Sequence, residues 1–108
     1  YTGIFKKKNN SDISELVNLE FETIGIRIPK NNFAINLVSA LQKPIITTSV
    51  NIHGEPSLNN AQQIKDKFSN INIFTDEKIN YSSKGSTIID FTKTPIILLR
   101  QGDGVFLS

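Results

Sequence analysis

Short apolar segments alternate with polar segments along the chain and predict a series of strands and helices. Two runs, at residues 33–41 and 61–68, carry apolar positions at helical spacing, and each follows Asn residues that can cap a helix, at 31–32 and 59–60. Six other runs have the length of strands: residues 1–6, 23–28, 45–48, 71–74, 87–91 and 96–99. This alternation predicts an α/β domain with a mixed sheet.

The same pattern predicts which elements are buried. In the first helix, apolar residues cover more than one face, so we expect this helix to be well buried. The run at residues 96–99 consists of four consecutive large apolar residues, which is typical of a strand buried on both faces.

The composition narrows the classes of protein and of site. A chain of 108 residues, with 38% hydrophobic and 20% charged residues, is one small domain or part of one, neither disordered nor membrane-embedded in character. It has no Cys, which excludes zinc-thiolate sites and a cysteine nucleophile, and its single His53 excludes a two-His metal site. No apolar stretch approaches the roughly 18 residues of a membrane span, so we expect no membrane contact and a cytoplasmic location.

The charge pattern draws attention to two arginines. The net charge of +2 is too small to indicate nucleic-acid binding unless the charge is concentrated. Ten of the twelve cationic residues are Lys, whereas Arg27 and Arg100 lie in or beside apolar strands. A guanidinium binds carboxylate or phosphate at two points. Alternatively, each Arg marks a strand end and meets solvent or a local carboxylate.

Three hydroxyl-rich segments follow predicted strands or precede a helix. They lie at residues 47–51, at Ser57, and at 82–87. Small hydroxyls and backbone N–H groups at such positions commonly hold phosphate without a metal. The alternative is ordinary turn and cap chemistry, which Ser, Thr and Asn also favour.

Together, these segments are more specific than any one alone. They are, in order, residues 23–29 (TIGIRIP), 44–51 (PIITTSVN), 54–57 (GEPS), 85–90 (GSTIID) and 99–102 (LRQG). The series resembles the YrdC-like family, the threonylcarbamoyl-AMP synthases, over nearly the whole chain. The Ser-x-Asn and Ser-Thr-Ile-Ile-Asp elements are the most specific parts of the resemblance.

The resemblance implies a fold and a reaction. The fold would be a YrdC-like α/β domain with a twisted mixed sheet and flanking helices. The reaction would convert ATP, L-threonine and bicarbonate to L-threonylcarbamoyladenylate and pyrophosphate, with Mg²⁺ bridging phosphates. The product would serve the threonylcarbamoyladenosine modification of tRNA, with tRNA-modification proteins as partners and tRNA itself as a further candidate partner.

The resemblance also implies roles for eight residues of this chain. The Ser-x-Asn pair would be catalytic, with Ser49 and Asn51 contacting the nucleotide near the reacting phosphate. Three residues would bind L-threonine: Arg27 at its carboxylate, with Thr47 and Ser86 lining the pocket. Three further residues would contact ATP: Thr23, Ser57 and Arg100. No metal ligand is implied.

One departure from the family pattern affects the expected activity. Family members carry an upstream half with a Lys-x-Arg element that binds the triphosphate, and this chain does not contain it. We therefore expect residues 1–108 to be the C-terminal part of a single YrdC-like domain, inactive or nearly so by themselves, because catalysis of this kind depends on positioning and charge stabilisation. Two alternatives stay open: a non-catalytic RNA-binding module, and a carbamoyl-transfer domain of the same fold.

Overall fold

The computed structural model describes residues 1–8, 13–17, 21–75 and 82–107. The chain divides into two compact units. The first, called here the sheet unit, comprises Tyr1–Ile46 and Lys84–Ser108; the second, the loop–helix unit, comprises Thr47–Ser83.

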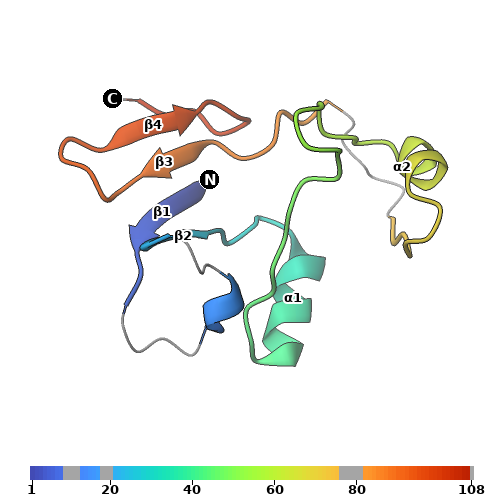
Figure 1. Cartoon of the computed structure of the whole chain (residues 1–108), viewed down its shortest axis with the longest axis horizontal. Helices are drawn as coiled ribbons and strands as arrows, with labels where there is room; N and C mark the ends of the chain where they lie inside the picture. Colours follow the sequence, from blue (N-terminus) through green and yellow to red (C-terminus); the bar gives the residue numbers. More distant parts are fainter. Residues whose placement is uncertain (9–12, 18–20, 76–81, 108) are drawn as a thin grey trace. The chain divides into compact units, whose positions relative to one another are not determined.

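The sheet unit contains a four-stranded mixed sheet (Figure 1). Its strands are β1 (Thr2–Lys6), β2 (Thr23–Ile26), β3 (Ile88–Asp90) and β4 (Ile97–Arg100), in the order β2-β1-β3-β4. The central strands β1 and β3 are parallel, and β2 and β4 pair antiparallel to them. The predicted mixed sheet is therefore confirmed.

This topology brings particular strand ends together. Gly3 of β1 pairs with Ile26 of β2, Thr2 of β1 pairs with Ile88 of β3, and Ile88 pairs with Arg100 of β4. The amino ends of β1 and β3 thus meet the carboxyl ends of β2 and β4. We call this edge the Arg100 end of the sheet.

The interior of the sheet unit is small. Ile89 of β3 is 6% exposed and is the one buried hydrophobic side chain among the described residues, while Thr87 is fully buried. The rings of Phe5 and Phe91 stack with centroids 5.2 Å apart. Gly3 leaves room for this stack, since a Cβ there would lie 2.5 Å from the Phe5 ring.

The two predicted helices form, and both are capped by Asn. Helix α1 (Asn32–Leu41) begins after Asn31, whose side chain accepts a hydrogen bond from the Ala34 N–H. Helix α2 (Ala61–Lys67) begins after Asn60, whose side chain accepts from Gln62 and Gln63. A further 3₁₀ turn, η1, spans Glu15–Val17. The starts of both helices could be predicted because a capping side chain accepts from N–H groups only two or three residues further along the chain.

Three strand predictions are wrong in whole or in part. Residues 45–48 and 71–74 have no strand structure. The strand expected at 23–28 ends at Ile26, so Arg27 lies after the strand and not within it. A strand requires a partner: β2 ends where its pairing with β1 ends, near the start of β1 at Thr2.

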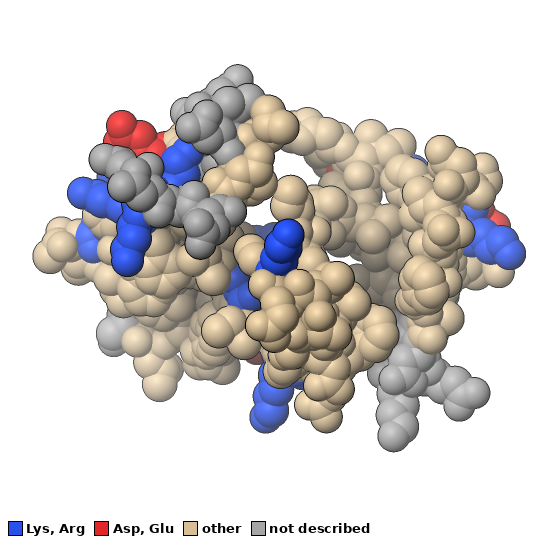
Figure 2. All heavy atoms as spheres, turned by 90° about the horizontal axis from the view of Figure 1, so that it is seen from below, with Lys and Arg blue, Asp and Glu red and all other residues tan. Residues whose placement is uncertain are grey.

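Both burial predictions are also wrong. Helix α1 has no buried residue, its Phe33 is 70% exposed, and it packs against none of the four strands. All four residues of β4 are exposed, with Leu99 at 56%. On the face drawn in Figure 2, most atoms belong to residues other than Lys, Arg, Asp and Glu. The sequence pattern correctly marks these elements as apolar, but the described residues provide nothing that covers them.

This exposed apolar surface predicts self-association of the isolated 108-residue chain. The edge strand β4 combines open backbone groups with exposed Ile97 and Leu99, which favours pairing with other copies. Light scattering after size exclusion should show oligomers that are reduced in the double variant Ile97→Lys/Leu99→Lys. The same change at Leu107, which lies outside the strands, should have little effect. A clean monomer that binds no hydrophobic dye would contradict this prediction.

A search of the described residues for a helix with the length and hydropathy of a membrane span finds none.

Candidate functional site

Three of the four candidate residues in the sheet unit lie at the Arg100 end. Arg27 directly follows β2, Ser86 lies two residues before β3, and Arg100 is the last residue of β4. Thr23 does not join them. It pairs with Lys6 at the opposite end of β1, three residue steps along β2 from Ile26, or about 10 Å.

Arg100 and Ser86 are in direct contact. The guanidinium donates two hydrogen bonds to the Ser86 carbonyl oxygen, from Nε at 3.1 Å and from Nη2 at 2.7 Å. A register shift between β3 and β4 precedes this contact: Ile89 pairs with Leu98, but Ile88 pairs with Arg100, so Leu99 is the extra residue of a bulge. Bulges commonly redirect a side chain in this way.

Further hydrogen bonds join the segments that carry these two residues. We call them the 84–87 segment and the 100–104 segment. The Gly102 N–H donates to Thr87 Oγ1 and the Asp103 N–H donates to the Gly85 carbonyl. In return, the Lys84 N–H donates to Asp103 Oδ1, and Thr87 Oγ1 donates to the Gly104 carbonyl. The buried Thr87 hydroxyl is thus bonded as both donor and acceptor.

Two glycines permit this close approach. A Cβ on Gly102 would lie 2.2 to 2.6 Å from backbone atoms of Gly85, Ser86 and Thr87. Gly85 has φ +77°, and a Cβ there would lie 3.2 Å from Arg100 Nη2. Glycine permits such close backbone contact because it lacks a side chain. Both glycines stand in the segments GSTIID and LRQG, but the sequence alone does not indicate this role.

The Ser86 hydroxyl has its own partner in β1. Thr2 Oγ1 donates to Ser86 Oγ at 2.9 Å, and the Thr2 N–H donates to the Thr87 carbonyl at 2.8 Å. Sequence reasoning missed Thr2, and no local signal marks it, since the contact joins residues 84 positions apart.

Arg27 presents a different environment from Arg100. Its side chain is exposed, and within the described part of the chain it has no hydrogen-bond or ion-pair partner. Its guanidinium is therefore available to bind a carboxylate from solution at two points.

The Ser-x-Asn pair lies in the loop–helix unit, where the two side chains are hydrogen-bonded. Ser49 Oγ donates to Asn51 Oδ1 at 2.5 Å. The Asn51 amide donates in turn to the carbonyls of Ile52, at 3.0 Å, and Glu55, at 3.1 Å. Asn51 thereby fixes the loop that follows it and orients the Ser49 hydroxyl.

The same loop is closed by two further contacts. The Leu58 N–H donates to the Val50 carbonyl at 2.8 Å, which joins the two ends of the loop. The Glu55 carboxylate forms an ion pair with Lys67 of α2. Both charged side chains are partly exposed, so the ion pair contributes orientation more than stability.

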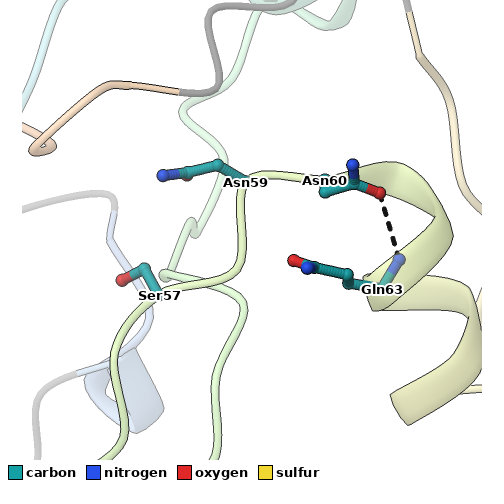
Figure 3. Close-up of a pocket in the computed structure, with 4 residues that line it drawn as sticks. All are labelled: Ser57, Asn59, Asn60 and Gln63. Carbon is teal, nitrogen blue, oxygen red and sulfur yellow. Dashed lines mark hydrogen bonds between the residues drawn. The ribbon is translucent and has the colours of Figure 1, made fainter.

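The two other candidates of this unit differ in their surroundings. Thr47 is exposed in a segment without regular structure. Ser57 lines a polar pocket with Asn59, Asn60 and Gln63 (Figure 3). The Asn59 amide donates to the Ser83 carbonyl at 3.1 Å, so it is anchored across the unit. Sequence reasoning identified the Asn pair as caps and missed that the pocket beside Ser57 is lined by amides.

Asp90, the last residue of the Ser-Thr-Ile-Ile-Asp element, forms a turn. Its Oδ1 accepts from the Thr92 hydroxyl at 2.6 Å and from the Thr92 N–H at 2.8 Å. These two bonds, the hydroxyl first, and the nearby Lys93 lower the pKa of the Asp90 carboxyl, while its partial burial acts in the opposite direction. This carboxylate is held by its own turn, which indicates a structural role.

Thr92→Val is therefore expected to raise the pKa of Asp90 toward its ordinary value. The valine removes the hydroxyl bond and keeps the backbone bond, so the pKa should rise only part of the way. Because the pKa of Asp90 is lower in the folded state than in the unfolded state, the bonds from Thr92 stabilise the fold above the ordinary pKa. This stabilisation is lost as pH falls through the pKa of the folded state. NMR titration of the carboxyl carbon measures the pKa directly. An unchanged value would show that the hydroxyl is not the main cause.

No group of three or more His, Asp or Glu residues that could hold a metal ion occurs in the described parts of the chain.

Comparison with known proteins assigns the chain to a family. The sequence model of Sua5/YciO/YrdC proteins, described as "Telomere recombination", matches residues 1–102. The chain belongs to the Sua5/YciO/YrdC family. All eight candidate residues lie within the matched range, and the resemblance inferred from the sequence segments is confirmed.

Relatives in the Sua5/YciO/YrdC family include a named enzyme. The chain is 33% identical over 82 residues to the threonylcarbamoyl-AMP synthase of Pyrococcus abyssi (strain GE5 / Orsay), which covers 75% of this chain and 24% of the relative. It is 31% identical over 84 residues to the YciO protein of Escherichia coli (strain K12), which covers 77% of this chain and 41% of the relative. The chain thus spans less than half the length of these relatives.

A solved structure supports the same family and fold. A double variant of P. abyssi Sua5 matches the chain with a TM-score of 0.70 at 28% identity, covering 94% of this chain and 31% of that one. The predicted YrdC-like α/β fold is therefore confirmed, whereas the roles of the individual candidate residues stay predictions.

Proposed function

We propose that the protein containing this chain is an L-threonylcarbamoyladenylate synthase that supplies tRNA modification. The observation that carries the proposal is the family match over residues 1–102, which includes every candidate residue, together with similarity to a threonylcarbamoyl-AMP synthase. The substrates would be ATP as its Mg²⁺ complex, L-threonine and bicarbonate. The ion would be held largely by phosphate oxygens and water.

The geometry of each unit supports distinct roles in this reaction. The bond between the α- and β-phosphates breaks, so charge develops on phosphate oxygens that need positioned donors. The Ser49 and Asn51 pair lies within a loop closed on itself, where the Ser49 hydroxyl donates to Asn51 Oδ1 and both amide donors of Asn51 are bound to backbone carbonyls. The Ser49 hydroxyl would supply such a donor by turning from Asn51 Oδ1 to a phosphate oxygen. At the Arg100 end, the exposed Arg27 suits the threonine carboxylate, and Ser86 would line the same pocket.

The remaining candidates complete the proposal. Thr47 would line the threonine pocket, and Thr23, Ser57 and Arg100 would contact ATP. The amide-lined pocket beside Ser57 offers hydrogen-bond donors and acceptors of the kind that bind a nucleotide. Because the chain spans only part of its relatives, residues 1–108 alone would have little or no activity.

Pyrophosphate release from ATP by the complete gene product tests this function. The assay omits L-threonine and bicarbonate in turn, and release should require both. Release that depends on carbamoyl phosphate instead would indicate carbamoyl transfer. Binding of tRNA with steep salt dependence, without ATP binding, would indicate an RNA-binding module.

A further inference from the structure

Arg100 is committed to the protein backbone by two of its five N–H donors. Both bonds end on the Ser86 carbonyl oxygen, and the side chain is otherwise exposed. These two bonds hold the guanidinium against the 84–87 segment. The donors on the outer edge of the guanidinium are the ones that an anion from solution would reach.

We propose that Arg100 is a positioning residue for Ser86 and couples nucleotide binding to amino-acid binding. This inference rests on the proposed function, in which Arg100 contacts ATP and Ser86 lines the threonine pocket. One planar group would then bind phosphate on its outer edge and the Ser86 backbone on its inner edge. Movement of the guanidinium toward the nucleotide changes the position of Ser86.

The hydrogen bonds around Arg100 link its position directly to that of Ser86. The 84–87 and 100–104 segments are joined by the bonds from the Gly102 N–H to Thr87 Oγ1 and from the Asp103 N–H to the Gly85 carbonyl, so a shift of one segment would strain its bonds to the other. Ser86 Oγ is held separately by Thr2, which fixes the hydroxyl while Arg100 fixes the carbonyl. Any effect of nucleotide on threonine affinity must be matched by an equal effect of threonine on nucleotide affinity, because the coupling is reciprocal.

The experiment measures L-threonine affinity of the complete gene product by calorimetry, with and without a non-hydrolysable ATP analogue and Mg²⁺. In the wild type, the analogue should tighten threonine binding about tenfold. We call the ratio of threonine affinities with and without the analogue the coupling factor. Arg100→Lys keeps the charge but loses the two-point contact with the Ser86 carbonyl, so this factor should fall to about one. Lys93→Gln, a charge change in the β3–β4 connection, should leave the factor at the wild-type value.

Two further variants separate positioning from folding. Thr2→Val removes the bond to Ser86 Oγ and should weaken threonine binding equally with and without the analogue, leaving the factor unchanged. Gly85→Ala places a Cβ 3.2 Å from Arg100 Nη2 and also strains a backbone with φ +77°, so thermal unfolding is measured beside it; if the fold is intact, the factor should fall below the wild-type value. These results would support the proposal even if one variant folds poorly.

The outcomes distinguish this inference from the proposed function. If Arg100→Lys weakens only analogue binding and the factor persists, Arg100 is a nucleotide contact and the inference is overturned. A wild-type factor of one overturns it as well. If the wild type binds no L-threonine under either condition, the proposed function fails and the inference fails with it.

Discussion

Asn51→Ala is expected to lower kcat/KM for threonine-dependent pyrophosphate release by the complete gene product about 100-fold. The asparagine side chain accepts from Ser49 and donates to the carbonyls of Ile52 and Glu55, so the alanine removes three hydrogen bonds together. The loop that presents the Ser49 hydroxyl then loses its internal support. A small displacement of a positioned group has a large kinetic effect, because catalysis by positioning depends on near-attack geometry.

Two companion variants make this prediction specific. Ser49→Ala removes the presented hydroxyl itself while the Asn51 amide still anchors the loop, so a loss at least as large, about 100-fold, is expected. Asn70→Ala truncates an exposed Asn of the same unit and should retain wild-type kinetics. Thermal unfolding of all three variants checks that the fold is intact. If Asn51→Ala and Asn70→Ala have equal kcat/KM, the pair has no part in the reaction.

Gly102→Ala is expected to destabilise the complete gene product by about 3 kcal/mol, as overpacking of close contacts does. Its Cβ would lie 2.2 Å from the Gly85 carbonyl oxygen and 2.6 Å from the Thr87 nitrogen. These are backbone atoms, which cannot rotate away as a side chain can. Relief of the clash would separate the 84–87 and 100–104 segments and break the bond from the Gly102 N–H to the buried Thr87 hydroxyl.

Gly25→Ala is the matched control for this prediction. A Cβ on Gly25 would meet its nearest neighbour, the Ile4 side chain, at 3.4 Å, an ordinary contact. Its effect on stability should stay within about 0.5 kcal/mol. Urea unfolding measures both free energies. Equal stability of the two variants would mean that the segments are not packed as described.

Local chemistry explains which parts of the fold could be predicted. Asn31 and Asn60 cap helices where the sequence places them, because a cap involves groups within three residues. The strands at 45–48 and 71–74 fail for the opposite reason: apolar composition permits a strand, but only a paired neighbour makes one. Burial of Phe33 and Leu99 depends on elements distant in the sequence. The apolar pattern alone therefore predicted more burial than the structure shows.

The same difference between local and distant contacts applies to the candidate site. Short segments with unusual residues, such as Ser49 with Asn51 and the two arginines, stand out in the sequence. The contact of Arg100 with Ser86 could not be predicted, since it depends on the register of β3 with β4 and on a one-residue bulge. Thr2 was missed because it is an ordinary strand residue until β1 pairs beside β3.

The most direct test of the proposed function identifies the product. The complete gene product is incubated with Mg²⁺-ATP, L-threonine and isotope-labelled bicarbonate, and the nucleotides are analysed by mass spectrometry. The account predicts a labelled nucleotide with the mass of threonylcarbamoyl-AMP, formed together with pyrophosphate and absent when L-threonine is omitted. A labelled nucleotide that forms without L-threonine, or ATP that is consumed with no label in any nucleotide, would contradict it.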